Sequence, residues 1–335
     1  MPNLVRNIDS SYALDWSKWP VPTMPDVPTE PWAGIPGSFW RDDVRYLPID
    51  AARTASLAAY NVPVRASAGA APYAGTSYGM PYSLVSETLL KTKVWDLARP
   101  VTWNWFTPTY PTVSVPLPDT VRLEGDPNGS SDLHYYGFDP VAQVLYEMIV
   151  VSKSSLNYLK TLGQCEWTAG YAGGASGIAR WDCKKTWNTP GQPQGVVAAG
   201  IPQFPLIVRW DEIKKGRIGH AVFGVLPNYN KAKIGAARGS DGDLLDHPVR
   251  AGERLRLKRS VVEKFALGTP ARIIAQAMYE FGWIQGDRNQ WAAGSWTGNG
   301  NFALSQDRRW SLGEGNIPPL GTFEVSLTDF EVVQQ

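Results

Sequence analysis

The sequence predicts a mainly β protein: a jelly-roll-like β-sandwich with one packed amphipathic helix and an extended N-terminal arm. The first observation is composition, because 15 Trp and 14 Tyr favour strands, whereas 27 Pro and 32 Gly favour turns. The second is that short apolar runs recur along the chain and are separated by turn residues. The third is that one segment alone keeps a convincing helical period. Many short strands with a single packed helix favour a sandwich over α/β layering.

Residues 1–42 are predicted to be an extended Pro/Trp-rich docking arm. This stretch carries proline throughout and four tryptophans, without a sustained period of 2 or 3.6. Exposed tryptophan area of this size is normally covered, either by the same chain or by a partner. Residues 43–335 are predicted to form a single β-sandwich domain with long loops, since a chain of this length and 43% hydrophobic content can bury a core.

The elements of the body follow from local patterns. Asp50 is expected to cap a short helix. The stretch LHYYGFDPVAQVLYEMIVV at 133–151 predicts a hairpin that turns at Asp139-Pro140 and carries Gln143 and Glu147 at period-2 polar positions. Further strands are predicted at 204–213, 217–226 and 254–262, and short strands follow to the C-terminal LTDFEVV.

The convincing helix is TPARIIAQAMYEFGW at 269–283. Thr269 can cap its N-terminus, Pro270 suits the first turn, and Gly282 ends the pattern. One apolar stripe faces the core and consists of Ile273, Ile274, Ala277, Met278 and Phe281.

Charge and hydropathy exclude several classes of partner. The formal net charge is +1 and the charges are interspersed, so neither nucleic acid nor an anionic membrane is expected. No signal peptide and no run of the roughly 20 apolar residues needed to span a bilayer is expected. Cys165 and Cys183 can close one loop or stay as free thiols, and two Cys with three His make a zinc finger unlikely on composition.

The first candidate site is the hairpin edge around His134. Asp132 and His134 are two residues apart, so on a strand their side chains share a face that Glu147 on the paired strand can reach. Such a group can orient a general base or hold a metal. The structural alternative, which we favour, is a buried histidine bonded to a carboxylate.

A second candidate lies in VRWDEIKKGRIGHAV. Arg209, Asp211, Glu212 and His220 converge if two strands pair here. Paired carboxylates can serve as acid and base in glycoside cleavage, but adjacent residues on a strand point to opposite faces. The common signatures of hydrolases, nucleotide-binding loops and zinc proteases are absent from the sequence.

One of two polar loops is a weak candidate for calcium. DPNGSSD at 126–132 spaces oxygen donors at Asp126, Asn128 and Asp132, but its glycine does not fit a calcium-binding EF-hand loop. A polar turn is the alternative. The loop GSDGDLLDH at 239–247 is expected to be solvated. No cofactor is therefore expected, with Ca²⁺ as the one ion left open.

Aromatic residues in polar surroundings are the remaining signal. A flat ring can stack on a sugar while neighbouring amides bond the hydroxyls, so these residues are candidates for glycan binding. The alternative is that each ring fills the end of the sandwich. The candidates are Trp103, Trp105, Tyr110, Trp291, Trp296 and Trp310.

Several segments in the same order resemble a family of secreted actinobacterial proteins of undefined activity, whose relatives include actinobacteriophage minor tail proteins. The resemblance runs from about residue 40 to the end. It is carried by LPID (47–50), GMPY (79–82), LEGDP (123–127), SDLH (131–134), LYE (145–147), WTAG (167–170), GIPQFPLIVRWDEI (200–213), GRIGHAV (216–222), RLRLK (254–258), ARIIAQAMYEFG (271–282) and TDFEVV (328–333).

The departures from that family bear on function. The secreted members have Arg where Leu133 stands and Asp where Gly219 stands, so this chain has lost two polar neighbours of the candidate site. The resemblance therefore implies a virion protein of the phage tail, which reaches the cell exterior by lysis and needs no signal peptide. Its implied partners are other tail proteins through the N-terminal arm, further copies of itself and host envelope polysaccharide.

The sequence is therefore compatible with three functions. The first is a minor tail protein at the tail tip or side that contacts envelope glycan during adsorption. The second is a glycan hydrolase or lyase that uses His134 with Glu147 or Asp211 as acid and base, with His220 as a further candidate. The third is a purely structural virion accessory protein.

Overall fold

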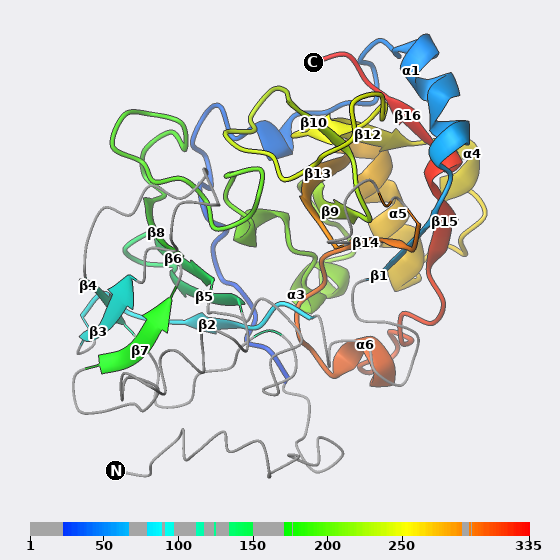
Figure 1. The fold of residues 1–335 in the computed structure, drawn as a ribbon. Helices are drawn as coiled ribbons and strands as arrows, with labels where there is room; N and C mark the ends of the chain where they lie inside the picture. The colour runs from blue at the N-terminus through cyan, green and yellow to red at the C-terminus, as the bar shows by residue number, and fades with distance from the viewer. Residues whose placement is uncertain are drawn as a thin grey trace, which may run out of the picture.

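The fold of the chain is mainly β, as predicted. The computed structural model describes residues 23–66, 79–88, 91–96, 112–116, 124, 134–149, 171–175, 177–289, 295 and 297–335. Within these residues the strands form sheets of seven, four, three and two strands, and the helices are short apart from one (Figure 1).

The largest sheet has the strand order β15-β1-β14-β9-β13-β12-β16. Strands β1 and β14 run parallel, as do β9 and β13, and the other neighbours run antiparallel. The two edge strands follow one another in the chain across the short helix η5, so the sheet curls nearly into a barrel. The bounds are β1 Pro63–Ala66, β9 Val222–Leu226, β12 Arg254–Leu257, β13 Trp283–Arg288, β14 Gly300–Phe302, β15 Glu324–Ser326, η5 Leu327–Asp329 and β16 Phe330–Val332.

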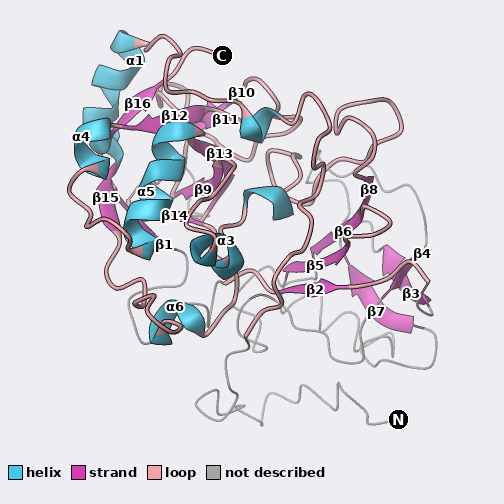
Figure 2. Ribbon diagram, turned by 180° about the vertical axis from the view of Figure 1, so that it is seen from behind, coloured by secondary structure: helices cyan, strands magenta, loops and turns pink. Residues whose placement is uncertain are grey.

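The predicted amphipathic helix is present as α5, Pro270–Glu280. The Thr269 side chain accepts a hydrogen bond from the backbone N–H of Arg272 at 3.3 Å, and Gly282 takes a positive φ of 88° just beyond the C-terminus. Its apolar stripe is buried against β12, where Ile274 and Met278 are fully covered. Figure 2 shows α5 lying along the large sheet beside α4, Arg259–Val262.

The second body of the fold is a four-stranded sheet in the order β2-β5-β6-β8. Its centre is the predicted hairpin: β5 and β6 pair antiparallel with Tyr136 opposite Glu147, and the turn begins at Pro140. Gln143 in this turn has a positive φ of 56°. The bounds are β2 Tyr82–Leu84, β5 His134–Asp139, β6 Val144–Ile149 and β8 Gly177–Asp182.

The remaining described elements are smaller. A three-stranded sheet has the order β4-β3-β7, and β10 pairs with β11. The short helix α1 is capped as predicted, since Asp50 accepts from the N–H of Arg53 at 3.0 Å. The bounds are η2 Phe39–Arg41, α1 Ala51–Ser56, η3 Leu57–Tyr60, β3 Lys91–Asp96, β4 Thr112–Pro116, β7 Tyr171–Ala175, η4 Phe204–Leu206, α3 Trp210–Lys214, β10 Asn230–Lys233, β11 Arg250–Ala251 and α6 Arg309–Leu312.

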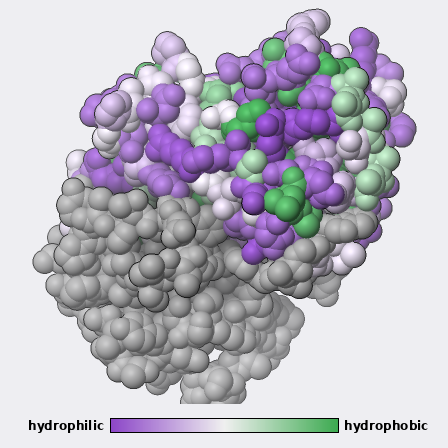
Figure 3. Space-filling model, turned by 45° about the horizontal axis from the view of Figure 1, so that its top comes forward, coloured by the Kyte–Doolittle hydropathy of each residue, from purple (hydrophilic) through white to green (hydrophobic). Residues whose placement is uncertain are grey.

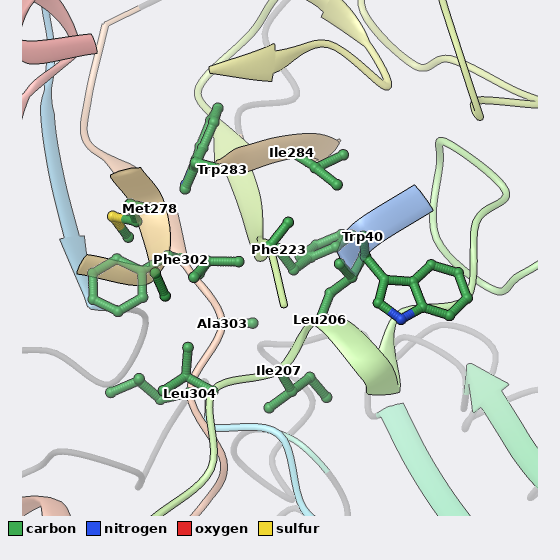
Figure 4. Close-up of a cluster of buried hydrophobic side chains, with 14 of the residues drawn as sticks. Trp40, Leu206, Ile207, Phe223, Met278, Trp283, Ile284, Phe302, Ala303 and Leu304 are labelled. Carbon is green, nitrogen blue, oxygen red and sulfur yellow. The ribbon is translucent and has the colours of Figure 1, made fainter. Parts of the chain in front are cut away.

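One continuous hydrophobic core joins the large and the four-stranded sheets. It includes Met278 and Phe302 on the side of the large sheet and Trp181 and Leu145 on the other. Figure 4 shows how the middle of this core is filled: Leu206 and Ile207, in and just after η4, lie near Trp40, Phe223 of β9 and Leu304, which follows β14.

Residues 23–42 are part of this core, and we call them the strap. Trp32 and Trp40 are fully buried, and their rings meet edge to face at 5.3 Å. The indole N–H of Trp32 donates to the carbonyl of Lys185 at 2.9 Å, and the backbone of Ala221 donates to the carbonyl of Trp40 at 2.7 Å. This part of the expected arm is therefore docked on its own chain, whereas residues 1–22 lie outside the described part.

The surface that the structure describes is mixed. Figure 3 shows mainly hydrophilic residues on one face, with separate hydrophobic spots. Within the described ranges, no helix combines the length and the apolar character needed to cross a membrane. The exposed large hydrophobic residues are Tyr46, Ile49, Val141, Leu245, Leu267 and Leu312.

Candidate functional site

Arg209, Asp211, Glu212 and His220 do come together, but not through paired strands. Of the strand predicted at 204–213, η4 takes the start and α3 the end, and Val208 between them forms an isolated bridge to Leu304. Glu212 explains the difference, because its carboxylate accepts the backbone N–H of Arg209 at 2.9 Å and thereby caps the helix. The strand predicted at 217–226 is present in its second half as β9.

The Arg209 guanidinium is the centre of this cluster and is fully buried. Its Nη2 lies 2.6 Å from both carboxylate oxygens of Glu30 in the strap and 3.1 Å from Oε1 of Glu212. Its Nε lies 3.4 Å from Oδ1 of Asp211, whose other oxygen accepts from Lys215 at 2.8 Å. Three carboxylates therefore surround one guanidinium, and one of them comes from a segment about 180 residues away.

His220 completes the cluster from the chain just before β9. Its Nδ1 lies 2.7 Å from the carbonyl oxygen of Ala221, and its Nε2 lies 2.8 Å from Oε1 of Glu212. A carbonyl can only accept a hydrogen bond, so Nδ1 donates and Nε2 is the nitrogen that faces the carboxylate. The imidazole is therefore held between the backbone at the start of β9 and the Glu212 carboxylate.

The neighbouring charges keep both Glu212 and Arg209 ionised in spite of their burial. Burial opposes ionisation of Glu212, but the charges of Arg209 and His220 outweigh it and hold the pKa of Glu212 below its usual value. Burial would lower the pKa of Arg209, yet Glu212, Glu30 and Asp211 raise it, so the guanidinium stays charged. Glu212 and Arg209 therefore both stay charged near neutral pH, and neither of them is suited to exchange a proton there.

His134 is buried and paired with a carboxylate. Its Nδ1 lies 2.5 Å from Oε2 of Glu124, and its ring stacks on Tyr136 with 6.0 Å between centroids. This geometry matches the structural alternative for His134, in which the histidine braces the sheet. The carboxylate is Glu124, whereas Asp132 lies outside the described residues.

Glu147 lies on the same face of the hairpin, but it contacts another part of the chain. Its Oε1 accepts the backbone N–H groups of Gln203 and Phe204 at 2.7 and 2.8 Å, and its Oε2 accepts the indole N–H of Trp181 at 2.9 Å. The side chain is fully buried, and this burial raises the pKa of Glu147 to about 7, although the three donors lower it. The carboxylate thus ties β6 and β8 to the start of η4.

The two polar clusters meet around Phe204 in η4. The ring of Tyr136 stacks on it at 6.0 Å, and the Arg209 guanidinium lies over it at 5.5 Å. The Tyr136 hydroxyl also donates to the side-chain oxygen of Gln203. The candidates found in separate sequence motifs therefore surround the junction between the two sheets.

The aromatic candidates for glycan binding have a different outcome. Trp310 is buried, with its indole N–H donating to the carbonyl of Ser305 at 2.9 Å and its ring edge to face with Trp210. It fills the core and presents no face for a sugar, which corrects the expectation of an exposed ring. The other five lie outside the described residues: Trp103, Trp105, Tyr110, Trp291 and Trp296.

The metal candidates find no support in the described residues. Asp126, Asn128 and Asp132 lie outside them. In the part of the chain that is described, no three His, Cys, Asp or Glu side chains are grouped so that they could hold a metal ion. Cys183 is a buried free thiol, and burial raises its pKa, while Cys165 is not among the described residues.

Sequence reasoning missed the partners that come from distant segments. Glu30 lies in the strap, Glu124 precedes the hairpin and Gln203 precedes η4. Nothing in the local pattern around these residues distinguishes them from ordinary surface positions. The one usable signal was the four tryptophans in residues 1–42, whose large apolar area indicates docking without saying where.

Comparisons with protein-family models, with curated proteins and with solved structures found no match to this chain. The four catalytic candidates, His134, Glu147, Asp211 and His220, are each at most 4% exposed. Each of them is bonded to a partner within the chain, which is the arrangement of a structural brace.

Proposed function

We propose that this chain is a non-catalytic minor tail protein of a phage virion that contacts host envelope glycan during adsorption. The observation that carries the non-catalytic part is the burial of His134, Glu147, Asp211 and His220, each bonded within the chain. A general acid or base must reach the proton that it transfers, directly or through one water. Side chains that brace the core do not meet this requirement.

The tail assignment is supported by the ordered resemblance to actinobacteriophage minor tail proteins. In this proposal the N-terminal segment contacts neighbouring tail proteins and the β body contacts the glycan. The strap supports this arrangement, because Asp26 and Glu30 fix the end of that segment to Lys214 and Arg209. Assembly as a homo-oligomer and localisation in the virion tail belong to the same proposal.

The jelly-roll topology stays a prediction. Jelly rolls are antiparallel, whereas the large sheet of this chain includes the parallel pairs β1–β14 and β9–β13. The proposal does not depend on that topology. It depends on a β body and on aromatic side chains that can stack on a sugar.

Binding is tested with insoluble cell wall from an actinobacterial host. The full chain is expected to sediment with the wall in a saturable way. The double variant Trp103→Ala, Trp105→Ala is expected to bind the wall at least tenfold more weakly, since stacking of one ring on an aromatic side chain contributes about 1–3 kcal/mol. Leu267→Ala serves as the control, because Leu267 is 83% exposed and aliphatic. A folded chain that never sediments with the wall would support a purely structural accessory protein instead.

The tail location is tested by electron microscopy of intact particles labelled with an antibody against this chain. Label at the tail tip or side is expected. Label on the capsid, or only on material released from lysed cells, would contradict the tail assignment.

A second candidate function, a glycan hydrolase or lyase, is favoured by one observation. The pKa of Glu147 is raised to about 7 by burial, in the range that suits a general acid. Release of sugar from the wall by the wild type, lost in Glu147→Gln and in His134→Ala with the fold intact, would establish this alternative.

A further inference from the structure

Residues 23–32 of the strap, which we call the strap peptide, dock on the body as a bound peptide does. Met24 and Val27, three residues apart, are buried, and the segment ends at the fully buried Trp32. Prolines stand at positions 25, 28 and 31 and therefore also recur every third residue. This is the period of a polyproline II segment, which is extended before it docks and so loses little entropy on binding.

The body also holds the main chain of the strap peptide. The N–H of Met24 donates to the Asp307 carboxylate at 3.0 Å, and its carbonyl accepts from Arg309 at 2.8 Å. Asp307 and Arg309 are buried and paired with each other at 2.7 Å. The carbonyl of Pro25 accepts from the Tyr82 hydroxyl. These side chains form a site for a peptide, because they can bind the same segment whichever copy of the chain it belongs to.

Charge complementarity aligns the strap peptide on this site. The segment carries two carboxylates and no basic residue. Asp26 lies 2.5 Å from Lys214 and 3.5 Å from Arg309, and Glu30 lies 2.6 Å from Arg209. Opposite charges at fixed positions set the register of a bound segment. The site therefore fits an acidic segment that contains proline and has this spacing of carboxylates.

A short turn joins the strap peptide to the rest of the chain. In residues 33–37 all positions except Ile35 are exposed, and Gly34 and Gly37 take positive φ values of 73° and 77°. The backbone N–H of Ile35 closes the turn by donating to the carbonyl of Trp32 at 3.1 Å. If this turn opens, the strap peptide can leave its own body and form the same contacts on another copy.

We propose that the strap peptide of one copy docks on the body of a second copy and so links neighbouring subunits. The contacts are those of the single chain and only the turn at 33–37 changes, so exchange costs little beyond the freedom lost on association. Exchange is favoured where copies are concentrated, as they are in an assembly. The inference rests on the proposed assembly as a homo-oligomer, and it names the segment that joins the copies.

Exchange is tested on the full wild-type chain by refolding a mixture of unlabelled and isotopically labelled copies and isolating the dimer by size exclusion. A carbodiimide then joins the Asp26 carboxylate to the Lys214 amine, which are in contact and partly exposed. Mass spectrometry of the digested dimer is expected to show about half of these links between a light and a heavy peptide. A dimer with like-isotope links alone would overturn the exchange and leave the homo-oligomer standing.

The variant Gly34→Ala tests the turn. A Cβ at Gly34 meets nothing within 4 Å, so its effect is confined to the left-handed backbone of the closed turn. This backbone disfavours alanine, so the dimerisation constant is expected to rise about fivefold or more.

Gly268→Ala is the matched control, because Gly268 has a φ of 77°, an equally open Cβ position and no part in the turn. It is expected to lower the melting temperature and to leave dimerisation as in the wild type. Equal dimerisation of the two variants would contradict the exchange. Wild type and Gly34→Ala that both stay monomeric at every concentration would overturn the exchange and the homo-oligomer together.

Discussion

At the scale of single residues, the polar side chains at the sheet junction form hydrogen bonds and ion pairs with the backbone and with each other. Glu147 accepts three N–H donors, and Glu212 serves Arg209 and His220 at once. Replacing one member of such a buried set leaves its partners without compensation. The stability of the chain should therefore respond strongly to conservative changes at these positions.

Glu147 makes stability depend on pH. In the folded chain its pKa is about 7, above the ordinary glutamate value of 4.5, so the folded state holds this proton more tightly. The resulting stabilisation is present below about pH 4.5 and is lost as the pH rises through 7. We expect Glu147→Gln to remove a fall of about 3 kcal/mol in unfolding free energy between about pH 5 and pH 8.

The measurement is urea denaturation at several pH values, with Glu263→Gln as the control. Glu263 is an exposed carboxylate paired with Arg259 on α4, so this variant should keep the wild-type pH dependence. A Glu147→Gln variant that retains the wild-type fall would show that another group causes it.

Arg209 is expected to be the most sensitive charge in the chain. Arg209→Met keeps most of the side-chain volume but removes the guanidinium that the buried Asp211 and Glu212 share with Glu30, so that only Lys215 and His220 still contact those two carboxylates. We expect a loss of about 3–5 kcal/mol in unfolding free energy. Lys214→Met is the control, because the Lys214–Asp26 pair is exposed and should cost less than about 1 kcal/mol. Equal losses in the two variants would contradict this account.

At the scale of elements, the parallel pair β9–β13 depends on two glycines that admit aromatic rings. A Cβ at Gly224 in β9 would overlap the indole of Trp283, and one at Gly286 in β13 would overlap the ring of Phe223. Both rings are buried in the core and have little room to move. Glycine is needed at these two strand positions because any Cβ would occupy the space of a buried ring.

Gly224→Ala is therefore expected to destabilise the fold by about 1–3 kcal/mol or more, since it overpacks a filled core. Gly219→Ala is the matched control, because nothing lies within 4 Å of a Cβ at that position. Thermal unfolding followed by near-ultraviolet circular dichroism compares the two. A melting temperature of Gly224→Ala equal to that of Gly219→Ala would contradict the packing argument.

Elements with local signals could be predicted from the sequence. The cap at Thr269 and the stripe that includes Ile274 and Met278 mark α5, and the two apolar runs that meet at Asp139-Pro140 mark the hairpin of β5 and β6. The segment with Arg209 could not be predicted, because its apolar run FPLIV reads as a strand while Glu212 caps a helix in the folded chain. The ion partners could not be predicted either, since Glu30 and Glu124 are recruited by tertiary contacts.

At the scale of the whole molecule, the strap joins the parts into one body. Trp32 packs on Trp181 of the four-stranded sheet. Arg309, at the start of α6, donates a hydrogen bond to the carbonyl oxygen of Met24 at 2.8 Å. The strap also supplies Glu30 to the junction between the sheets. The strap therefore ties the two sheets and their junction together.

The most direct test of the central claim, that the buried polar residues brace a binding protein and perform no catalysis, is analysis of host cell wall incubated with the purified chain. Bound protein and released saccharide are measured together, the latter by mass spectrometry. We predict saturable binding with no more saccharide than heat-denatured protein releases. Saccharide released by the native chain, and lost in a folded Asp211→Asn or Glu147→Gln variant, would contradict the account.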